Sequence, residues 1–426
     1  MREKGQTEVA KTLETPVFSR GIEILTEKFE LPEIKDDEIL VKVVSDSICM
    51  STYKTVKQGA NHKRVPNDVY DNPIIIGHEF AGDIVKVGKK WQDKFKPGQK
   101  FAQQPAIPGQ MESPGYSYRW CGGDSEYCIF PNDIIEAGCL WTFEGDSYFA
   151  ASVAEPMCCV ISGFHTHYHT VPGCYDHVMG TKEGGNIIIL GGCGPMGLGA
   201  VSYSLTYENK PKRVIVTDID DARIARAKEV ISEADAKEHG IELHYVNTAA
   251  MEDQVKELMA LTDGKGYDDV FVYIPNQSVC EMASKLLAYD GNLNLFAGPT
   301  DPNFSAMMNL YNCHYSRHRI LGSTGGTIDD MKEAIDKDAK GLIQSAVMIT
   351  HIGGLDAVCE TTQNLPNVPG GKKLIYTHIN MPLTAIEDFD ELGKTNDLFK
   401  QLAIATKKTN GLWNAEAEKI LLNYNK

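Results

Sequence analysis

The sequence lacks the long apolar runs that would anchor it in a membrane. No stretch of its 426 residues is continuously apolar over the roughly 20 residues that a spanning helix needs. The first residues also lack the basic and then apolar character of a secretory signal. We therefore expect a cytoplasmic protein without a membrane partner.

Positive charge and closely paired cysteines are scarce as well. The 42 Lys and Arg residues are outnumbered by 58 Asp and Glu residues, which gives a net charge of -16. Because a nucleic-acid partner needs a positive surface, we expect none. The 11 cysteines show no paired spacing. In a reducing compartment this indicates buried thiols or a metal ligand, and excludes a disulfide framework.

What the sequence does contain is enough apolar material for two domains, since 426 residues with 42% hydrophobic content exceed a single core. Residues 1 to about 135 show short alternating stretches broken by Gly and Pro, which predicts a β-rich, barrel-like domain. From Gly184 onward, apolar strands alternate with charged helices such as Ala222–Ala236. This alternation predicts a doubly wound parallel sheet that binds its ligand at the carboxyl ends of the strands.

A glycine-rich turn opens the second domain. It follows the apolar run Asn186–Leu190 and fits the pattern G-x-G-x-x-G. Glycines at these places allow a tight turn and a close approach to a pyrophosphate, and the proline inside the pattern suits the first turn of a helix. The expected cofactor contacts here are Gly192, Gly194, Pro195, Met196 and Gly197.

The next predicted strand, Arg213–Thr217, ends at Asp218. A carboxylate at this place accepts hydrogen bonds from the adenosine ribose hydroxyls and repels a 2′-phosphate, which favours NAD(H). Arg223 and Arg226 lie nearby, so NADP(H) is not excluded.

Gly298 and Ser323 each lie just past a later predicted strand of the second domain. We expect them to contact the nicotinamide side of the cofactor, although a simple turn explains each equally well.

Two places in the β-rich part and a third that follows it carry possible metal ligands: Cys49, His78 and Glu155. Thiolate, imidazole and carboxylate form a legitimate catalytic zinc set that leaves a fourth position for water or substrate. Spacing alone leaves a plain alternative, in which Cys49 is a buried thiol, His78 is a core histidine and Glu155 caps a helix.

The order of these motifs carries a resemblance. Cys-x-Ser, Gly-His-Glu and Glu-Pro, followed by G-x-G-x-x-G and an acid after the second strand, resemble the zinc-dependent medium-chain dehydrogenase/reductase family over essentially the whole chain. A Glu at position 155 instead of a second Cys is typical of its polyol dehydrogenase branch. Within that branch, four stretches resemble the bacterial L-sorbose 1-phosphate reductases: Asn61–Asn67, Pro114–Tyr118, Gly298–Pro302 and Met348–Leu355.

The resemblance implies a fold and its boundaries. We expect an α/β protein in which a doubly wound parallel Rossmann sheet is joined to a β-rich GroES-like catalytic domain. The catalytic, zinc-binding domain should cover residues 1–165 and the NAD-binding domain residues 166–345. Residues 346–426 should return to the catalytic domain and end in helices.

The resemblance also assigns roles in the site. Cys49, His78 and Glu155 become zinc ligands. We further expect Ser51 to relay the proton, because its hydroxyl is two residues from the metal thiolate. Glu79 should reach the metal or its water and help exchange water for substrate. We expect this contact to be transient or through water, because one thiolate and one carboxylate already neutralise Zn²⁺.

We expect one zinc per subunit and no structural zinc, because the stretch 101–128 contains only Cys121 and Cys128. One of the two lysines Lys372 and Lys373 is expected to touch the cofactor pyrophosphate. The subunits should form a homodimer or homotetramer.

The expected reaction is hydride transfer between NAD(H) and a ketose or polyol, with L-sorbose 1-phosphate and D-glucitol 6-phosphate as the favoured pair. A sorbitol-type or other alcohol dehydrogenase of free substrates is one alternative, and a nucleotide-binding protein without chemistry is another.

The sequence leaves the roles of two groups of residues undecided. Basic residues of the first domain are either solvated or contact a phosphate: Lys54, Lys63, Arg64 and Arg119. Histidines near the domain border form either a polar linker or a second metal site: His165, His167, His169 and His177.

Overall fold

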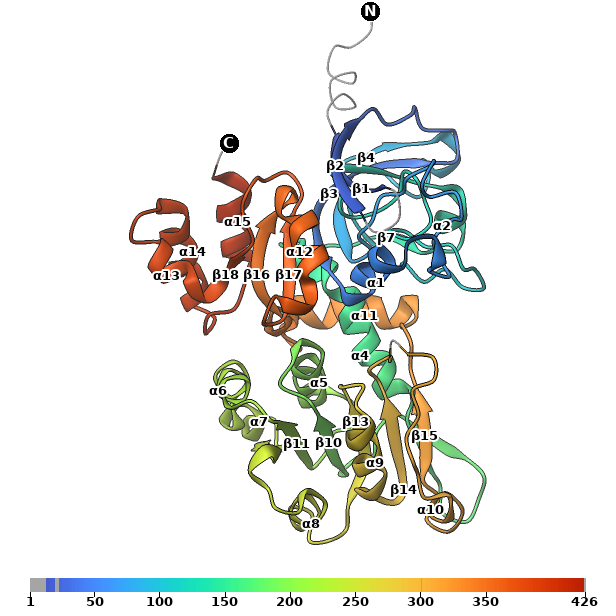
Figure 1. The fold of residues 1–426 in the computed structure, drawn as a ribbon, viewed down its shortest axis with the longest axis vertical. Coiled ribbons are helices and arrows are strands. Elements are labelled where there is room, and N and C mark those ends of the chain that lie inside the picture. The colour runs from blue at the N-terminus through green and yellow to red at the C-terminus, as the bar shows by residue number, and fades with distance from the viewer. Residues whose placement is uncertain (1–12, 20–22, 300, 425–426) are drawn as a thin grey trace, which may run out of the picture. The chain divides into compact units, whose positions relative to one another are not determined.

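The computed structural model describes residues 13–19, 23–299 and 301–424 (Figure 1). The chain divides into two compact units, of which unit 1 comprises residues 1–155 and 349–426 and unit 2 residues 156–348. The first crossing between them falls inside helix α4 (Ala154–Thr166), ten residues before the predicted border at 165. A crossing inside a helix leaves no loop composition to mark it. In the described part of the chain, no helix has both the length and the apolarity that crossing a bilayer requires.

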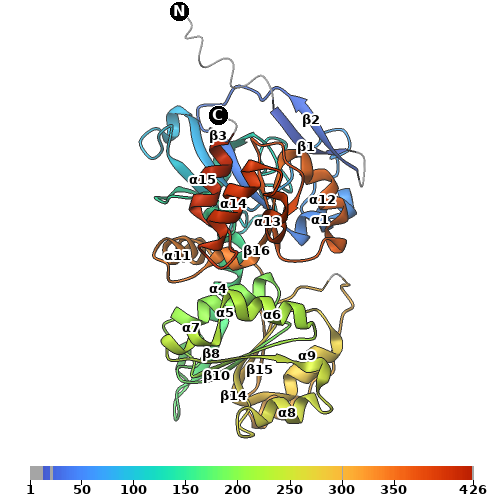
Figure 2. The same ribbon diagram turned by 90° about the vertical axis from the view of Figure 1, so that its left-hand side faces the viewer.

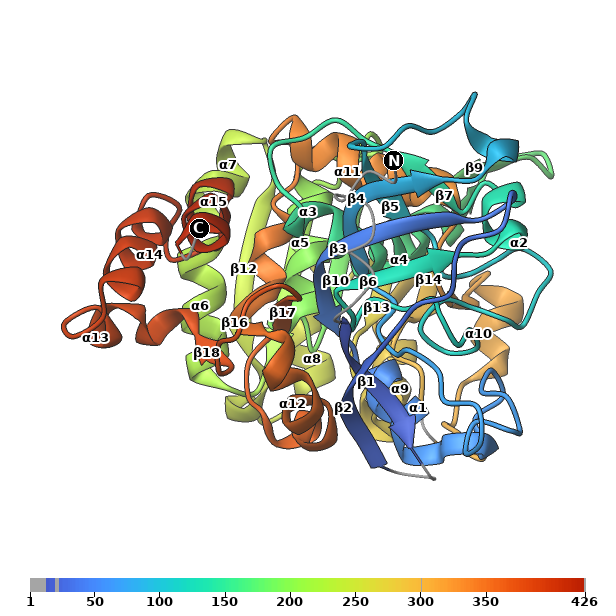
Figure 3. The ribbon, with the colours of Figure 1, turned by 90° about the horizontal axis from the view of Figure 1, so that it is seen from above.

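Unit 1 is built on an eight-stranded sheet with the order β18-β16-β17-β3-β4-β5-β7, and β6 pairs with β3. Strands β3, β4 and β5 lie side by side (Figure 3). The buried rings of Phe80, Phe101 and Phe130, from β4, β5 and β6, pack against one another in stacked and edge-on pairs. The strands of unit 1 are β1 (Leu13–Ser19), β2 (Glu23–Phe29), β3 (Ile39–Ile48), β4 (Phe80–Val87), β5 (Lys100–Gln103), β6 (Tyr127–Phe130), β7 (Leu140–Thr142), β16 (Ile349–Gly354), β17 (Lys372–Tyr376) and β18 (Thr384–Ala385).

The carboxyl-terminal segment docks onto this sheet through one buried carboxylate. Glu418 accepts hydrogen bonds from the backbone N–H groups of Tyr148 (2.7 Å) and Phe149 (2.9 Å) and from the Tyr376 hydroxyl (2.8 Å). The tail therefore belongs to unit 1, as the family resemblance implies. The helices of unit 1 are α1 (Met50–Gln58), α2 (Asn132–Glu136), α3 (Phe149–Ser152), α12 (Val358–Asn364), α13 (Phe389–Leu392), α14 (Asp397–Lys407) and α15 (Ala415–Asn423).

Unit 2 is built on a six-stranded sheet in which every pair is parallel and the order is β12-β11-β10-β13-β14-β15. This order reverses direction between β10 and β13, as in a doubly wound dinucleotide fold. Strands β8 and β9 form a separate antiparallel pair. Helices α5 and α6 lie on one face of the sheet and α8 and α9 on the other (Figure 2). The strands of unit 2 are β8 (Tyr168–Thr170), β9 (His177–Met179), β10 (Asn186–Leu190), β11 (Arg213–Asp218), β12 (Glu242–Asn247), β13 (Tyr267–Val272), β14 (Leu287–Leu295) and β15 (Arg319–Gly322).

The helices of unit 2 differ from the sequence prediction in one place. The helix expected over Ala222–Ala236 is two helices, because Ser232 interrupts it and caps the second one with its side chain. The helices of unit 2 after α4 are α5 (Pro195–Thr206), α6 (Asp221–Val230), α7 (Glu233–Glu238), α8 (Gln254–Ala260), α9 (Gln277–Lys285), α10 (Leu310–Tyr315) and α11 (Ile328–Ala339).

Candidate active site

Three neighbouring strands of unit 1 bring distant parts of the chain together. Strand β3 ends directly before Cys49, and its antiparallel neighbour β4 begins directly after Glu79. On the other side of β3, strand β17 runs antiparallel with Lys373 opposite Ile48. Continuing that register by one residue brings Lys372 next to Cys49.

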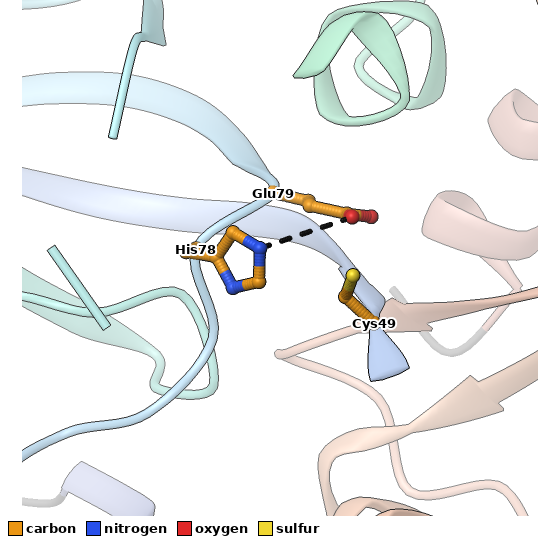
Figure 4. Close-up of side chains that lie close together, drawn as sticks. All are labelled: Cys49, His78 and Glu79. Atoms are coloured by element: carbon orange, nitrogen blue, oxygen red, sulfur yellow. Dashed lines mark ion pairs between the residues drawn. The ribbon is translucent and has the colours of Figure 1, made fainter. Parts of the chain in front are cut away.

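The side chains of Cys49, His78 and Glu79 point toward one another (Figure 4). Each offers one possible ligand atom, and these three atoms all lie within 4.8 Å of one another. His78 and Glu79 are buried, and Cys49 is half-buried. Thiol, imidazole and carboxylate at this spacing match the ligands that zinc prefers.

The first turn of α1 fixes the histidine ring. Ser51 Oγ lies 3.2 Å from His78 Nε2 and donates to Cys49 Sγ over 3.0 Å. Thr52 Oγ1 lies 3.2 Å from Nδ1, the other ring nitrogen. These contacts hold the imidazole in one orientation. In metal sites the ring nitrogen that does not bind the metal is usually hydrogen-bonded, as Nδ1 is here to Thr52. The predicted proton relay Ser51 thus contacts two of the predicted ligands.

Tyr116 also belongs to this cluster, although the sequence analysis gave it no role. Its buried hydroxyl lies 3.2 Å from His78 Nε2. The preceding Gly115 has φ +75°, and a Cβ there would lie 2.1 Å from the carbonyl oxygen of Gly77. Only glycine fits this close approach. A Gly-aromatic pair in an irregular stretch was the available signal for this residue.

A buried ion pair binds Glu79. Lys372 Nζ donates to both carboxylate oxygens of Glu79, at 2.5 and 2.6 Å, and the Ser47 hydroxyl donates to the same carboxylate. Burial works against the charged forms. The Lys372 ammonium nevertheless lowers the pKa of Glu79, and the facing Cys49 and Glu79 raise the pKa of Lys372. Glu79 is therefore an ionised carboxylate whose charge is already compensated.

Glu155 lies near this group but outside the set of mutually close ligand atoms. It is the second residue of α4, just after α3, where the Ser152 hydroxyl donates to the Ser45 carbonyl of β3 over 2.9 Å. Burial and the charge of Glu79 raise the pKa of Glu155 to about 7. Its place among the zinc ligands stays a prediction.

The protonation states of the other donors suit a metal. Burial lowers the pKa of His78, so the ring is neutral near pH 7 and can donate a lone pair. Burial raises the pKa of the Cys49 thiol, so without a cation the thiol keeps its proton. A bound cation would stabilise the thiolate at this place. The donor set therefore fits a zinc ion.

In unit 2, the glycine-rich turn connects β10 to α5. Gly194 is the N-cap of α5 and Pro195 its first residue, as predicted. A Cβ on Gly197 would lie 2.3 Å from the carbonyl oxygen of Gly192, so the helix can approach the turn only with glycine at position 197. The N–H groups of α5 are thereby available to an anion at the carboxyl end of β10.

The remaining predicted cofactor contacts lie at the carboxyl ends of neighbouring strands. Asp218 ends β11, and its carboxylate accepts the backbone N–H of Ile219 over 2.8 Å. Gly298 is exposed three residues after β14. Ser323 directly follows β15, and its hydroxyl donates to Asn294 over 3.3 Å. Their roles toward a cofactor stay predictions.

Comparison with known proteins identifies the family. The alcohol dehydrogenase GroES-like domain model matches residues 35–139, and the zinc-binding dehydrogenase model matches residues 195–340. A mannitol-1-phosphate 5-dehydrogenase of Aliivibrio fischeri is 48% identical over 93% of this chain and 94% of its own. An L-sorbose 1-phosphate reductase of Klebsiella pneumoniae is 44% identical over the same shares, 93% and 94%. The chain belongs to the zinc-binding dehydrogenase family.

The family predicted from the order of motifs is therefore confirmed, and the protein is an oxidoreductase of the polyol and alcohol dehydrogenase type. A solved structure agrees with the fold of this dehydrogenase: 2R,3R-butanediol dehydrogenase from Bacillus subtilis has a TM-score of 0.69 at 18% identity, over 86% of this chain and 100% of that one. The predicted fold class, a Rossmann sheet with a GroES-like domain, is confirmed as well.

Two other clusters of the dehydrogenase hold its own structure together. His167 and His169 both contact the buried carboxylate of Asp269, at 2.6 and 3.0 Å. They therefore tie the β8 segment to β13, and among the described side chains only Cys49, His78 and Glu79 have the geometry of a metal group. Cys121 and Cys128 are both fully buried. The absence of a structural zinc stays a prediction.

A buried acid pair lies beneath the site of the dehydrogenase. Asp46 Oδ1 accepts the backbone N–H of Glu79 over 3.0 Å. Burial and the neighbouring Asp124 raise the pKa of Asp46, and burial raises the pKa of Asp124 from 3.8 to about 6. The folded protein thus binds a proton that the unfolded chain releases near pH 4.

The raised pKa of Asp124 predicts that Asp124→Asn increases the free energy of unfolding by an amount that depends on pH. A carboxyl with a raised folded-state pKa stabilises the fold most below its unfolded pKa, and that stability is lost as the pH rises through the folded value. In the wild type this loss of stability should grow between about pH 4 and pH 6 and reach about 3 kcal/mol. Asparagine removes the ionisation, so urea unfolding at pH 8 should show the variant more stable, with a smaller gain at pH 5. A gain that does not change with pH would contradict this explanation.

Proposed function

We propose that the protein catalyses reversible hydride transfer between NAD(H) and a phosphorylated ketose or polyol, with L-sorbose 1-phosphate and D-glucitol 6-phosphate as the favoured pair. The observation that best supports this chemistry is that one ligand atom from each of Cys49, His78 and Glu79 lies within 4.8 Å of the other two, a spacing that could hold a metal ion. The substrate class is supported by two relatives at 44% and 48% identity, both named for sugar or sugar-alcohol phosphates.

Each residue of the site has a part in this proposal. Cys49, His78 and Glu155 would hold a zinc ion, which would supply Lewis acidity toward the substrate oxygen. Ser51 takes the hydroxyl proton when the polyol is oxidised and returns it when the ketose is reduced. Its hydroxyl contacts with Cys49 and His78, at 3.0 and 3.2 Å, support this role. Glu79, already paired with Lys372, helps exchange water for substrate.

The cofactor preference rests on Asp218. Asp218 is the last residue of β11, beside the turn that precedes α5. A cofactor whose pyrophosphate lies at the N-terminus of α5 would bring its adenosine ribose to this carboxylate. The nearby Arg223 side chain approaches Asp220 at 3.9 Å, and Arg226 donates to the Val347 carbonyl over 3.2 Å. These contacts favour NAD(H) over NADP(H). Assembly as a homodimer or homotetramer and a cytoplasmic location stay predictions.

A substrate panel tests the proposal. The zinc-loaded enzyme is assayed by NADH absorbance with L-sorbose 1-phosphate, mannitol 1-phosphate and D-glucitol 6-phosphate, with the matching free sugars, and with both cofactors. We expect kcat/KM for the best phosphorylated substrate to exceed that of its free counterpart by well above about tenfold, or 1.4 kcal/mol. We also expect NAD(H) to be preferred.

Two other outcomes would each indicate a different function. Equal turnover of free and phosphorylated sugars would indicate a sorbitol-type dehydrogenase. A zinc-loaded protein that binds NADH but turns over no alcohol or ketose would indicate a nucleotide-binding protein without chemistry.

A further inference from the structure

Four basic side chains of unit 1 gather beside the predicted zinc ligands: Lys54, His62, Lys63 and Arg64, here named the Arg64 patch. Lys54, His62 and Arg64 are half-buried, and Lys63 is exposed. Burial lowers the pKa of His62, and the charges of Arg64, Lys63 and Lys54 lower it further. The charges of Lys54, Lys63 and Arg64 thus all act on the His62 ring, which stacks on Tyr116.

The backbone and guanidinium of Arg64 are held in position by neighbouring groups. Arg64 Nη1 donates to Ser113 Oγ over 3.3 Å, and Ser117 Oγ donates to the Arg64 carbonyl over 2.7 Å. The guanidinium carbon lies 5.3 Å from the ring centre of Tyr116. Because these contacts already order the Arg64 side chain, little further side-chain conformational entropy is lost when an anion binds it.

The donor capacity of Arg64 is largely unused. A guanidinium has five N–H donors. Among the side chains that the structure describes, it makes one hydrogen bond, to Ser113, and no carboxylate forms an ion pair with Lys54, Lys63 or Arg64. Acidic partners are plentiful, since the chain has 58 Asp and Glu residues. Half-buried cations without a carboxylate partner suit an anionic ligand.

Tyr116 connects the patch to the reacting end of the site. Its hydroxyl lies 3.2 Å from His78 Nε2, and its ring stacks against His62 with 5.7 Å between ring centres. Lys54 follows Ser51 by three residues on α1, so the two lie on neighbouring positions of one helix face. Tyr116 therefore contacts His78 at one end and the Arg64 guanidinium at the other.

We propose that the Arg64 patch binds the phosphate group of the substrate and that Arg64 selects phosphorylated over free sugars. This inference rests on the proposed function and names its specificity-determining residue. The planar guanidinium presents paired N–H groups that match phosphate oxygens, and Lys54 adds a second positive charge. The ligand class is a phosphate monoester whose carbonyl or hydroxyl carbon lies a few atoms from the ester.

The test compares Arg64→Met with the wild-type holoenzyme. For L-sorbose 1-phosphate with NADH, kcat/KM should fall about 10- to 100-fold, mainly through KM, because charge-assisted hydrogen bonds are lost. For free L-sorbose, kcat/KM should be nearly unchanged, as should the KM for NADH. Arg64→Lys keeps the positive charge but lacks the paired N–H donors of the guanidinium, so its kcat/KM should lie between those of the wild type and Arg64→Met.

Arg119→Met is the matched control. Arg119 also lies over an aromatic ring, that of Trp120 at 4.7 Å, and makes one side-chain hydrogen bond, to Asn72. It is exposed. This variant should keep the preference for phosphate.

Calorimetry with inorganic phosphate separates this inference from the proposed function. The wild-type holoenzyme should bind phosphate, and Arg64→Met should lose that binding, whichever sugar is turned over. If the wild type prefers phosphorylated sugars and Arg64→Met keeps both this preference and phosphate binding, the Arg64 assignment is overturned while the function stands. An equal loss with free and phosphorylated sugar would make Arg64 a structural residue and overturn the assignment as well.

Discussion

The Cys49→Ala variant is expected to lose turnover and zinc binding while it keeps nucleotide binding. The substitution removes the thiolate of the predicted zinc set, and the remaining groups are a neutral imidazole and carboxylates. Loss of the metal removes several kcal/mol of stabilisation of developing charge, so kcat/KM should fall by about a thousandfold or more. Metal analysis of the purified protein, NADH absorbance and NADH fluorescence titration measure the three quantities.

Cys174→Ala is the matched control for this experiment. Cys174 is an exposed thiol between β8 and β9 of unit 2, and its weak contacts are with Val171 and Asp176. Its loss should change neither zinc content nor turnover. A Cys49→Ala protein with full zinc content and full activity would remove the chemical basis of the proposed function.

The nucleotide part of the molecule could be predicted from the sequence because its signals are local. Strand, turn, helix and acid follow one another within Asn186–Asp218, and β10 occupies the predicted Asn186–Leu190. The order of parallel strands then follows from right-handed crossover connections between neighbours. The break at Ser232 was missed, since charged residues continue on both sides of it.

The catalytic part could be predicted only in its components. The motifs identified Cys49, His78 and Glu79, but the sequence did not indicate what surrounds them. Lys372 pairs with Glu79 across 293 positions of the chain, through the register of β17 on β3. No local pattern encodes such a register.

The lysine assignment changes accordingly. The sequence predicts that one of Lys372 and Lys373 touches the cofactor pyrophosphate. In the structure, Lys372 binds Glu79, and Lys373 Nζ donates to the backbone carbonyls of Pro369 (2.8 Å) and Gly371 (2.6 Å). Both ammonium groups thus have partners within unit 1, and we give neither of them to the cofactor.

The second large effect is expected from Lys372→Met. This change leaves the fully buried Glu79 carboxylate without its counter-charge, and removing one partner of a buried ion pair costs about 3–5 kcal/mol. The loss should be read from urea unfolding of the metal-free protein. The exposed pair of Lys86 and Glu33, which are 2.8 Å apart, provides the comparison, since Lys86→Met should cost less than about 1 kcal/mol.

The sign of the pH dependence follows from Glu79. In the wild type its pKa is lowered, so the pair stabilises above the unfolded value of 4.5 and loses this effect as the pH falls through the folded value. Without Lys372, burial instead raises the pKa of Glu79. The difference in stability between wild type and Lys372→Met should therefore increase from pH 5 to pH 8. A constant difference would indicate lost packing instead of lost charge compensation.

A double variant separates stability from catalysis. Lys372→Met combined with Glu79→Gln leaves no unpaired charge in the pocket, so much of the lost stability should return. Activity should not return, because the glutamine cannot take the part of a carboxylate near the metal. In the single variant the uncompensated Glu79 becomes a competitor for the metal, which makes the site net negative and lowers kcat. If Lys372→Met kept both its stability and its kcat, the ion pair would have neither of the two roles given to it here.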